Sequence, residues 1–254
     1  MAPVAVYDDV AGFYDATRGG ESRGDAFAAE LDGRLPPGVG PILEVGVGTG
    51  VVALGLRRRG RGVIGVDIAA AMLARARARL GPVLVRGDNR RLPFGDGSVA
   101  HAVSVWVAHA VEPPEAMFSE VARVLAPGGR YLVCPTNRSA AGDVIHPILT
   151  AMFERAQHLN PGWRQRQVGA SDILAWGVQA GFVGHVETCR SRSWLTSAAQ
   201  QMEWIENRIW VDLRGLDEDT YRHVARPALD ALATLPTGPI EQRAEADVVV
   251  LSLR

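Results

Sequence analysis

The chain has 254 residues, and 47% of them are hydrophobic, which is enough to bury a core without metals or disulfides. Its formal net charge of -1 argues against nucleic acid and against an anionic membrane surface as partners. Its two cysteines are too few for a disulfide framework. The N-terminus lacks the basic start and apolar core of a signal peptide, and no apolar stretch is long enough to span a bilayer, so we expect a cytoplasmic protein.

Short apolar segments alternate with helix-forming segments from residue 42 to residue 135. Such an alternation with short loops predicts parallel strands with helices on both faces of the sheet. The near-continuous apolar runs agree with strands that are buried on both faces. The expected strands are residues 42–46, 63–67, 83–88, 101–107 and 130–135, and the expected helices are residues 49–59, 69–80 and 113–125.

The alternation breaks after residue 138. Helical segments, among them residues 194–210 and 221–232, precede a last apolar strand at residues 246–253. We interpret residues 1–254 as a single domain whose additional helices form a lid. The ligand-binding core is expected at about residues 40–138, 170–190 and 245–254, and the lid elements at about residues 1–38, 139–168 and 191–243.

A glycine-rich turn follows the first strand, in the stretch I-L-E-V-G-V-G-T-G at residues 42–50. Glycines at the carboxyl end of a parallel strand let a ligand approach the backbone closely. The dinucleotide fingerprint G-x-G-x-x-G/A fails from Gly46, where the third place is Val51, and is met from Gly48, where it is Ala53. The turn therefore leaves a dinucleotide and another nucleoside ligand as alternatives.

Acidic residues at the ends of the neighbouring strands help to choose between these ligands. Asp67 ends the second strand, where a carboxylate can accept hydrogen bonds from the ribose hydroxyls of any adenosine ligand. Asp88 and Asn89 end the third strand, and a side-chain oxygen there can accept from an adenine amino group. Glu44 lies inside the first strand, where a buried carboxylate needs partners such as a ligand ammonium group or the N–H groups of the loop. A nucleoside with a cationic amino acid tail fits these residues better than one with a pyrophosphate.

Several motifs in order resemble the class I S-adenosylmethionine-dependent methyltransferases, and within them the ubiquinone-biosynthesis-like group that acts on small molecules. The resemblance covers roughly residues 7–136 well and the last strand loosely. The matching motifs are Y-D-D-V-A-G-F-Y-D-A-T-R (7–18), E-V-G-V-G-T-G (44–50), G-V-D (65–67), G-D-N-R-R-L-P-F (87–94) and R-V-L-A-P-G-G-R-Y-L-V (123–133).

The resemblance implies an α/β fold, namely a doubly wound, mostly parallel seven-stranded sheet with helices on both faces and a helical lid formed by insertions. It also implies that S-adenosyl-L-methionine is the cofactor and S-adenosyl-L-homocysteine the product. The methionine part of the cofactor would lie at the loop, the ribose and adenine at the next two strands, and the N-terminal lid over the cofactor, with Arg18 at its carboxylate. The residues implied are Tyr14, Arg18, Glu44, Gly46, Gly48, Asp67, Ile68, Asp88 and Asn89, in which Glu44 replaces the commoner aspartate.

The acceptor of the methyl group is harder to read from the sequence. The segment after the fourth strand, W-V-A-H-A-V-E at residues 106–112, lacks the Asn/Asp-Pro-Pro-aromatic signature of enzymes that methylate nucleic-acid bases or glutamine. In-line displacement at the methyl carbon needs alignment, exclusion of water and, for some acceptors, a base. His109 is the first candidate for that base and His146 the second, the alternative being a histidine that caps or packs. No pattern of metal ligands accompanies them, so we expect no metal.

We therefore predict a methyltransferase that acts on the oxygen or carbon of a small organic acceptor, with an aromatic or polyketide-like molecule preferred. The preference rests on the aromatic residues of the lid, Trp163, Trp194, Trp204 and Trp210, which form either core or an apolar acceptor pocket. Two alternatives stay open, an NAD-dependent oxidoreductase and a relative that binds the cofactor without methylating.

Overall fold

The computed structural model describes residues 3–38, 40–135, 138–139, 142–159, 168–189 and 192–253. The chain divides into two compact units. Unit 1 comprises Met1–Thr136, Arg166–Cys189 and Ala246–Arg254, and unit 2 comprises Asn137–Gln165 and Arg190–Glu245. The N-terminal residues that we assigned to the lid thus belong to the same unit as the sheet, and the prediction of a single domain stays a prediction.

Unit 1 is built on a seven-stranded sheet with the strand order β3-β2-β1-β4-β5-β10-β7. The five strands from β3 to β5 run parallel, whereas β10 runs antiparallel to both β5 and β7. The predicted mostly parallel seven-stranded sheet is therefore confirmed. The strands are β1 (Ile42–Val45), β2 (Val63–Asp67), β3 (Leu84–Arg86), β4 (Val99–Val105), β5 (Leu125–Cys134), β7 (Phe182–Thr188) and β10 (Asp247–Leu253).

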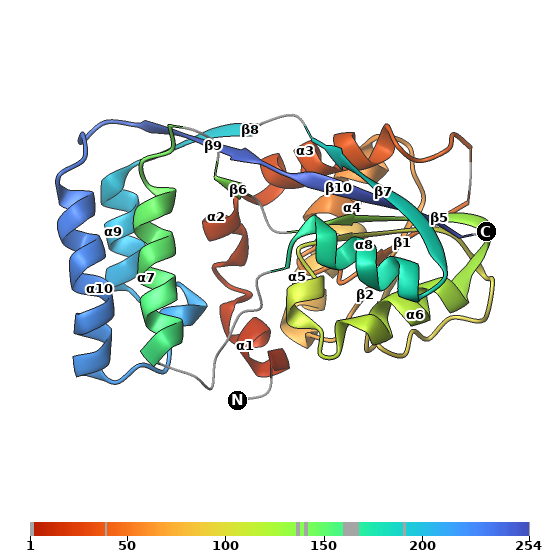
Figure 1. Cartoon of the computed structure of the whole chain (residues 1–254), viewed down its shortest axis with the longest axis horizontal. Coiled ribbons are helices and arrows are strands. Elements are labelled where there is room, and N and C mark those ends of the chain that lie inside the picture. The colour runs from red at the N-terminus through yellow and green to blue at the C-terminus, as the bar shows by residue number, and fades with distance from the viewer. Residues whose placement is uncertain are drawn as a thin grey trace. The chain divides into compact units, whose positions relative to one another are not determined.

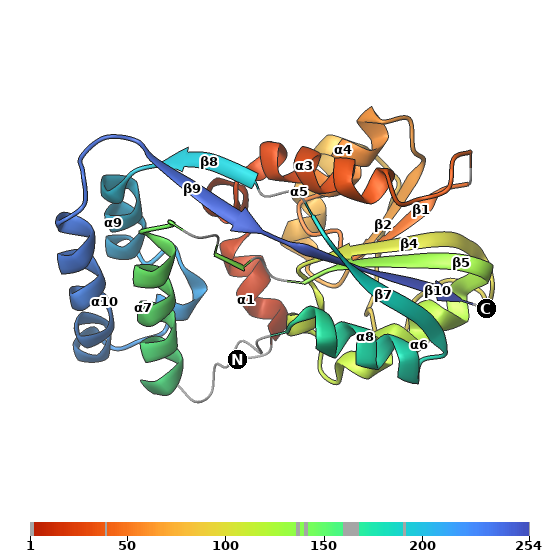
Figure 2. The ribbon, with the colours of Figure 1, turned by 45° about the horizontal axis from the view of Figure 1, so that its top comes forward.

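Helices cover both faces of this sheet, as predicted (Figure 2). Neighbouring residues of β5 point to opposite faces, so Leu132 packs with α3, α4 and α5, while Tyr131 packs with α6 and α8. The helices of unit 1 are α1 (Pro3–Val10), α2 (Tyr14–Arg18), α3 (Gly20–Asp32), α4 (Val51–Arg58), α5 (Ala70–Leu80), α6 (Pro114–Val124) and α8 (Ala170–Gln179), with the 3-10 turn η1 (Ala108–Ala110).

One local prediction about unit 1 was incomplete. The strand expected at residues 130–135 is longer than predicted, because β5 begins at Leu125 and continues through A-P-G-G at residues 126–129. The pairing of β4 with β5 shifts register between Val99 and His101, because the extra residues are accommodated as an irregularity in the strand.

Helix α3 lies unusually close to α4. A Cβ atom at Gly24 would come within 2.4 Å of the backbone oxygen of Val51, and one at Gly55 would come within 2.6 Å of the Cβ of Ala28. Val51 is the first residue of α4 and directly follows the glycine-rich turn. The N-terminal segment is therefore packed against the helix that leaves this turn.

In its described residues, unit 2 combines three α-helices with a small antiparallel sheet of strand order β6-β9-β8, and these helices lie side by side (Figure 1). The predicted helix at residues 194–210 is wrong at its start, because Trp194 belongs to β8 and Ser197 caps the N-terminus of α9 through its side chain. The elements are β6 (Arg138–Ser139), α7 (His146–Leu159), β8 (Arg192–Thr196), α9 (Ala198–Glu206), η2 (Val211–Leu213), α10 (Glu218–Ala233) and β9 (Ile240–Glu245).

The aromatic residues of unit 2 are mostly core. Trp210 is buried and packs edge-to-face on Phe153 and Trp204, with ring centroids 5.5 and 5.8 Å apart. Trp194 is exposed, and Trp163 lies outside the described residues. Within the described part of the chain, no helix combines the length and the hydropathy needed to cross a membrane.

Candidate functional site

The glycine-rich turn lies where the strand order reverses, between β1 and β4. Gly46, Gly48 and Gly50 have φ values of 73°, 53° and 81°, a region that favours glycine. A Cβ at Gly46 would come within 2.5 Å of the Val107 side chain, whereas one at Gly48 would meet nothing within 4 Å. The turn therefore packs closely against the segment after β4 and keeps open space beside Gly48, at the edge where ligands of such sheets bind.

Asp67 connects the end of β2 to this turn. Its Oδ2 accepts a hydrogen bond from the Gly48 N–H at 2.8 Å, and its Oδ1 accepts from the Ala69 N–H at 2.9 Å. Burial raises the pKa of Asp67, and these N–H donors oppose that rise. The carboxylate thus orders the turn through both of its oxygens. Ile68 follows it and is half-buried.

Asp88 and Asn89 have different surroundings after β3. Arg90 binds Asp88 with an Nη2–Oδ2 distance of 2.6 Å and lowers the pKa of that carboxyl. Asn89 is only 9% exposed, and its Oδ1 has no hydrogen-bond partner among the described residues. A buried amide oxygen without a donor is costly, so the structure points to Asn89, more than to Asp88, as the acceptor for a ligand amino group.

Glu44 carries a buried carboxyl group in strand β1, two residues before Gly46. Its side chain is 3% exposed, and its Oε2 has no hydrogen-bond partner among the described residues. Burial raises the pKa of Glu44 to about 8; the nearby Asp67 adds to that rise, while the Ala53 N–H and the charge of Arg23 oppose it. The carboxyl is therefore largely protonated at neutral pH in the unliganded protein, and a cationic ligand group would supply its missing partner.

The N-terminal segment is joined to the glycine-rich turn by contacts that the sequence did not reveal. Asp15 on α2 accepts a hydrogen bond from Thr49 Oγ1 at 2.6 Å and another from Arg79 Nη2 at 2.6 Å. Arg79 also donates to the backbone oxygen of Thr49 at 2.9 Å. Asp8 on α1 accepts from the Ala71 N–H at the start of α5 at 2.8 Å. Helices α1 and α2 are thus fixed to the turn and to α5.

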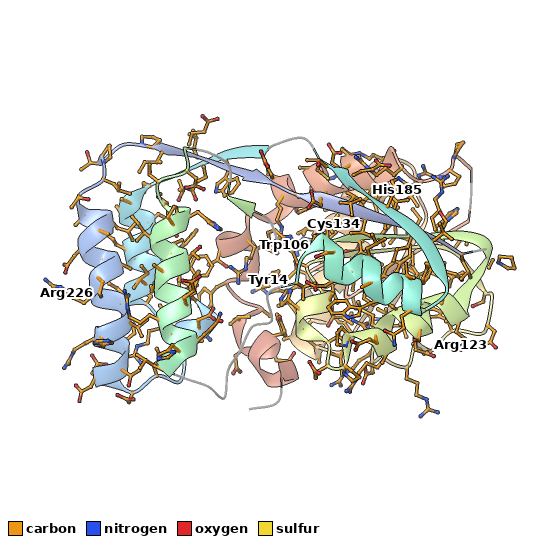
Figure 3. All side chains as sticks on the ribbon, viewed as in Figure 1. Tyr14, Trp106, Arg123, Cys134, His185 and Arg226 are labelled. Carbon is orange, nitrogen blue, oxygen red and sulfur yellow. The ribbon has the colours of Figure 1, made fainter. Side chains whose placement is uncertain are left out.

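Two arginines of this segment lie near the aromatic ring of Tyr14. The guanidinium carbon of Arg18 is 5.9 Å from the ring centroid, and that of Arg23 is 5.7 Å from it. Arg23 also lies over the ring of Trp106, at 4.3 Å (Figure 3 labels Tyr14 and Trp106). Sequence reasoning missed Arg23, which belongs to no motif, and gave no role to Trp106, although Trp106 opens the segment W-V-A-H-A-V-E.

His109 lies in η1, directly after β4, and contacts the N-terminal segment. Its Nε2 is 3.3 Å from the hydroxyl oxygen of Tyr7 on α1. Burial, assisted by the charge of Arg18, lowers the pKa of His109 to about 4, so the imidazole is neutral at physiological pH. The second candidate, His146, is the first residue of α7 in unit 2 and is exposed. Its backbone N–H donates a hydrogen bond to Asp143 Oδ1 at 3.0 Å.

Unit 2 has a shallow pocket of its own. Its volume is about 370 Å³, and Trp204, one of the aromatic residues predicted for an acceptor pocket, is part of its wall. The other lining residues are Leu195, Thr196, Ser197, Gln200 and Pro239. Among the residues that the structure describes, no group of three or more His, Cys, Asp or Glu side chains has the arrangement of a metal site.

Comparisons with known proteins agree with this geometry. A family model described as a methyltransferase domain matches residues 43–133, which reach from β1 to β5 and contain the glycine-rich turn. A demethylmenaquinone methyltransferase from Mycobacterium bovis is 34% identical over 185 residues, which cover 69% of this chain and 78% of the relative.

Solved structures show the same fold at lower identity. An S-adenosylmethionine-dependent methyltransferase from Thermotoga maritima has a TM-score of 0.62 at 18% identity and covers 98% of this chain and 99% of its own. The [4+2]-cyclase SpnF has a TM-score of 0.60 at 18% identity and covers 98% of this chain and 95% of its own. Since one of these two proteins is described as a cyclase, the fold alone does not determine the reaction.

Proposed function

The chain belongs to the class I S-adenosylmethionine-dependent methyltransferases of the ubiquinone and menaquinone type, and on that premise we propose that its acceptor is a small aromatic molecule with an ionisable hydroxyl group. It is an enzyme that uses S-adenosylmethionine to methylate a small organic molecule. Two observations support the proposal about the acceptor. Relatives are named for demethylmenaquinone, and a neutral histidine lies beside a tyrosine hydroxyl at the carboxyl end of β4.

The residues of unit 1 fit the cofactor. Glu44 and Asn89 each offer a buried oxygen that lacks a hydrogen-bond partner among the described residues, and Gly48 leaves open space beside the turn. We propose that Glu44, Gly46 and Gly48 hold the methionine part, Asp67 the ribose, and Asn89 with Asp88 and Ile68 the adenine. When bound, S-adenosylmethionine supplies a methyl carbon whose bond to sulfur breaks as its bond to the acceptor forms. The protein has to align the acceptor and exclude water.

The Tyr7–His109 pair is the observation that carries the acceptor proposal. A neutral imidazole accepts a hydrogen bond on one ring nitrogen and donates from the other, so it can orient a hydroxyl group and receive its proton. Tyr7 contributes its hydroxyl from the N-terminal segment, 3.3 Å from Nε2. The two side chains together favour an acceptor that carries a hydroxyl group.

The low pKa of His109 decides when the proton moves. A phenolic proton has a pKa of about 10, and transferring it to a base of pKa about 4 is uphill by about 8 kcal/mol. Methylation leaves a positive charge on a neutral acceptor, and the same proton then becomes strongly acidic. His109 therefore orients the hydroxyl before methyl transfer and takes the proton as the transfer is completed.

Kinetics of His109 variants test this proposal, with 1,4-dihydroxynaphthalene as acceptor and methyl-labelled S-adenosylmethionine as donor. We expect His109→Ala to lower kcat by about 10²- to 10⁴-fold with unchanged affinity for S-adenosylhomocysteine. In the wild type, kcat/KM should not fall between pH 8 and pH 6, because His109 stays neutral until about pH 4. A decline centred near pH 6.5, or full turnover by His109→Ala, would contradict the role of His109.

Further variants separate the remaining alternatives. His185→Ala, at an exposed position on β7, is the matched control, while His146→Ala tests the second candidate base. The prediction that Trp204 contacts the acceptor stays a proposal, to be tested by the KM of Trp204→Ala for the acceptor.

Calorimetric titration with S-adenosylhomocysteine and with NADH tests the oxidoreductase alternative. Cofactor binding without methyl transfer to any aromatic or amine acceptor would favour a relative that does not methylate.

A further inference from the structure

Trp106 is held in an uncommon backbone conformation at the carboxyl end of β4. Its φ is 60°, in the left-handed region that a residue with a side chain rarely adopts. Its backbone N–H donates to the carbonyl oxygen of Cys134 on β5 at 3.0 Å, and the next side chain, that of Val107, packs against Gly46 after β1. The neighbouring strands on both sides thus fix this conformation, and conformations of this kind are frequent at ligand sites.

The indole ring of Trp106 has an N–H group that the protein itself does not use. The guanidinium carbon of Arg23 lies over the ring, 4.3 Å from its centroid, and Phe27 packs edge-to-face with it at 5.7 Å. Since the N–H bond lies in the plane of the ring, a cation over the face does not occupy it. Nε1 is shielded from solvent and has no hydrogen-bond partner among the described residues. A buried donor without an acceptor is costly, which points to a ligand oxygen as its partner.

Trp106 and His109 border the same region of the N-terminal segment. Arg23, which lies over Trp106, is 5.7 Å from the ring centroid of Tyr14 (Figure 3). Arg18 is 5.9 Å from the same centroid, and its charge contributes to the low pKa of His109. Trp106 and His109 also belong to one short segment after β4. A ligand that reaches His109 therefore lies in the neighbourhood of the unused N–H group.

We propose that Trp106 is a specificity-determining residue, whose Nε1–H donates a hydrogen bond to a second oxygen of the acceptor while the first hydroxyl group lies at His109. An indole N–H is a donor only, so it binds the lone pair of a hydroxyl, carbonyl or ether oxygen. An acceptor that lacks this oxygen leaves the buried donor unpaired and is discriminated against. The inference rests on the proposed function, since it takes the acceptor to be a hydroxylated aromatic molecule.

Methyl transfer to acceptors with one and with two oxygens tests this role. The acceptors are 1-naphthol and the 1,2-, 1,3- and 1,4-dihydroxynaphthalenes, with methyl-labelled S-adenosylmethionine as donor. The ratio of kcat/KM for the best dihydroxynaphthalene to that for 1-naphthol should be about 5- to 20-fold higher in the wild type than in Trp106→Phe. The second hydroxyl alters the reactivity of the naphthalene ring equally with both proteins, so the change in this ratio isolates the N–H group.

Trp176→Phe on α8 is the matched control, because it makes the same substitution at a ring that packs on Phe118 at 5.7 Å, on the other face of the sheet. It should leave the ratio unchanged. Trp106→Phe should bind S-adenosylhomocysteine as tightly as the wild type in calorimetric titration. Weaker binding would assign the N–H to the cofactor and overturn the proposal. An unchanged ratio in Trp106→Phe, as expected for an N–H that faces the ring of Phe27, would overturn it as well.

The wild type decides the question even where Trp106→Phe does not fold. The preferred dihydroxynaphthalene, methylated at its second oxygen, still accepts a hydrogen bond but cannot donate one. This ether should keep the preference over 1-naphthol, and loss of the preference would overturn the proposal. Methylation of 1-naphthol reports the proposed function alone. If all acceptors are methylated without a preference for the second oxygen, only the role of Trp106 fails, whereas no methylation of any of them contradicts the proposed function itself.

Discussion

At the scale of single residues, Glu44 shows how burial sets the state of the site. Its carboxyl group is removed from water, and its pKa rises to about 8 although the Ala53 N–H and Arg23 favour the charged form. Desolvation therefore outweighs two stabilising interactions. The structural consequence is a neutral acid at the ligand turn that gains a partner when a cation binds. Its energetic consequence is a dependence of stability on pH.

The first prediction concerns this dependence in the unliganded protein. The folded-state pKa of Glu44 lies above its ordinary value of 4.5, so folding binds a proton between these pH values. The contribution of Glu44 to the free energy of unfolding is fully present below about pH 4.5. It is lost by up to about 1.4 kcal/mol per pH unit as the pH rises to about 8. Glu44→Gln should remove this decline, so its unfolding free energy relative to wild type should increase from pH 5.5 to pH 8.

Urea unfolding of the two proteins at pH 5.5, 7 and 8 measures this difference. His101 and His109 have lowered pKa values and contribute a slope of opposite sign, but they do so equally in both proteins. Parallel curves for wild type and Glu44→Gln would show that Glu44 is already ionised at neutral pH.

At the scale of elements, the packing of α3 on α4 brings part of the N-terminal segment to the glycine-rich turn. Gly24 and Gly55 let the two helices approach, and this approach carries Arg23 to the glycine-rich turn and Asp25 to Arg58, where the Oδ2–Nη1 distance is 3.0 Å. Since the obstacle at Gly24 is a backbone oxygen, a larger side chain there must displace a whole helix.

The second prediction follows from this contact. Gly24→Ala should lower the free energy of unfolding by about 1–3 kcal/mol, because its Cβ would overpack the interface. Gly33→Ala, at the end of the same helix, is the control: its Cβ would meet its nearest neighbour at an ordinary 3.6 Å, so the change should stay within about 0.5 kcal/mol. Urea unfolding measures both, and equal effects at the two glycines would refute the close approach.

At the scale of the whole molecule, the chain contains two units with separate cores. The core of unit 2 includes Ile145, Ile205 and Leu213, while unit 1 has one core on each face of its sheet. All candidate cofactor residues belong to unit 1. Ligand binding therefore should stabilise unit 1 directly, by mass action.

The third prediction separates the units by calorimetry. Ile205 is 0% exposed in unit 2, and Ile205→Ala should destabilise that unit by about 2–5 kcal/mol while leaving the affinity for S-adenosylhomocysteine unchanged. Ile173 is equally buried in unit 1. Ile173→Ala should instead lower the midpoint temperature of the unfolding transition whose midpoint S-adenosylhomocysteine raises. A single transition that both substitutions lower to the same extent would mean that the units unfold together.

The sequence by itself determined the parallel half of unit 1 and the type of ligand. The strands from β1 to β5 and their helices follow from local hydrophobic patterns. The glycine-rich turn with Glu44 and Asp67 is recognised from its residue types and their spacing. The sequence was less informative for unit 2, where β6 and β9 were not expected and Trp194 was assigned to a helix.

The tertiary structure alone decided which distant side chains meet. Tyr7 and His109 are 102 positions apart, Asp15 and Thr49 are 34 apart, and Asp15 and Arg79 are 64 apart. The same holds for Arg23 on Trp106 and for β10, which enters between β5 and β7 in the opposite direction. Hydrophobic periodicity and turn chemistry act over a few residues, so they define elements. Contacts between elements depend on how whole faces pack, and no local pattern encodes them.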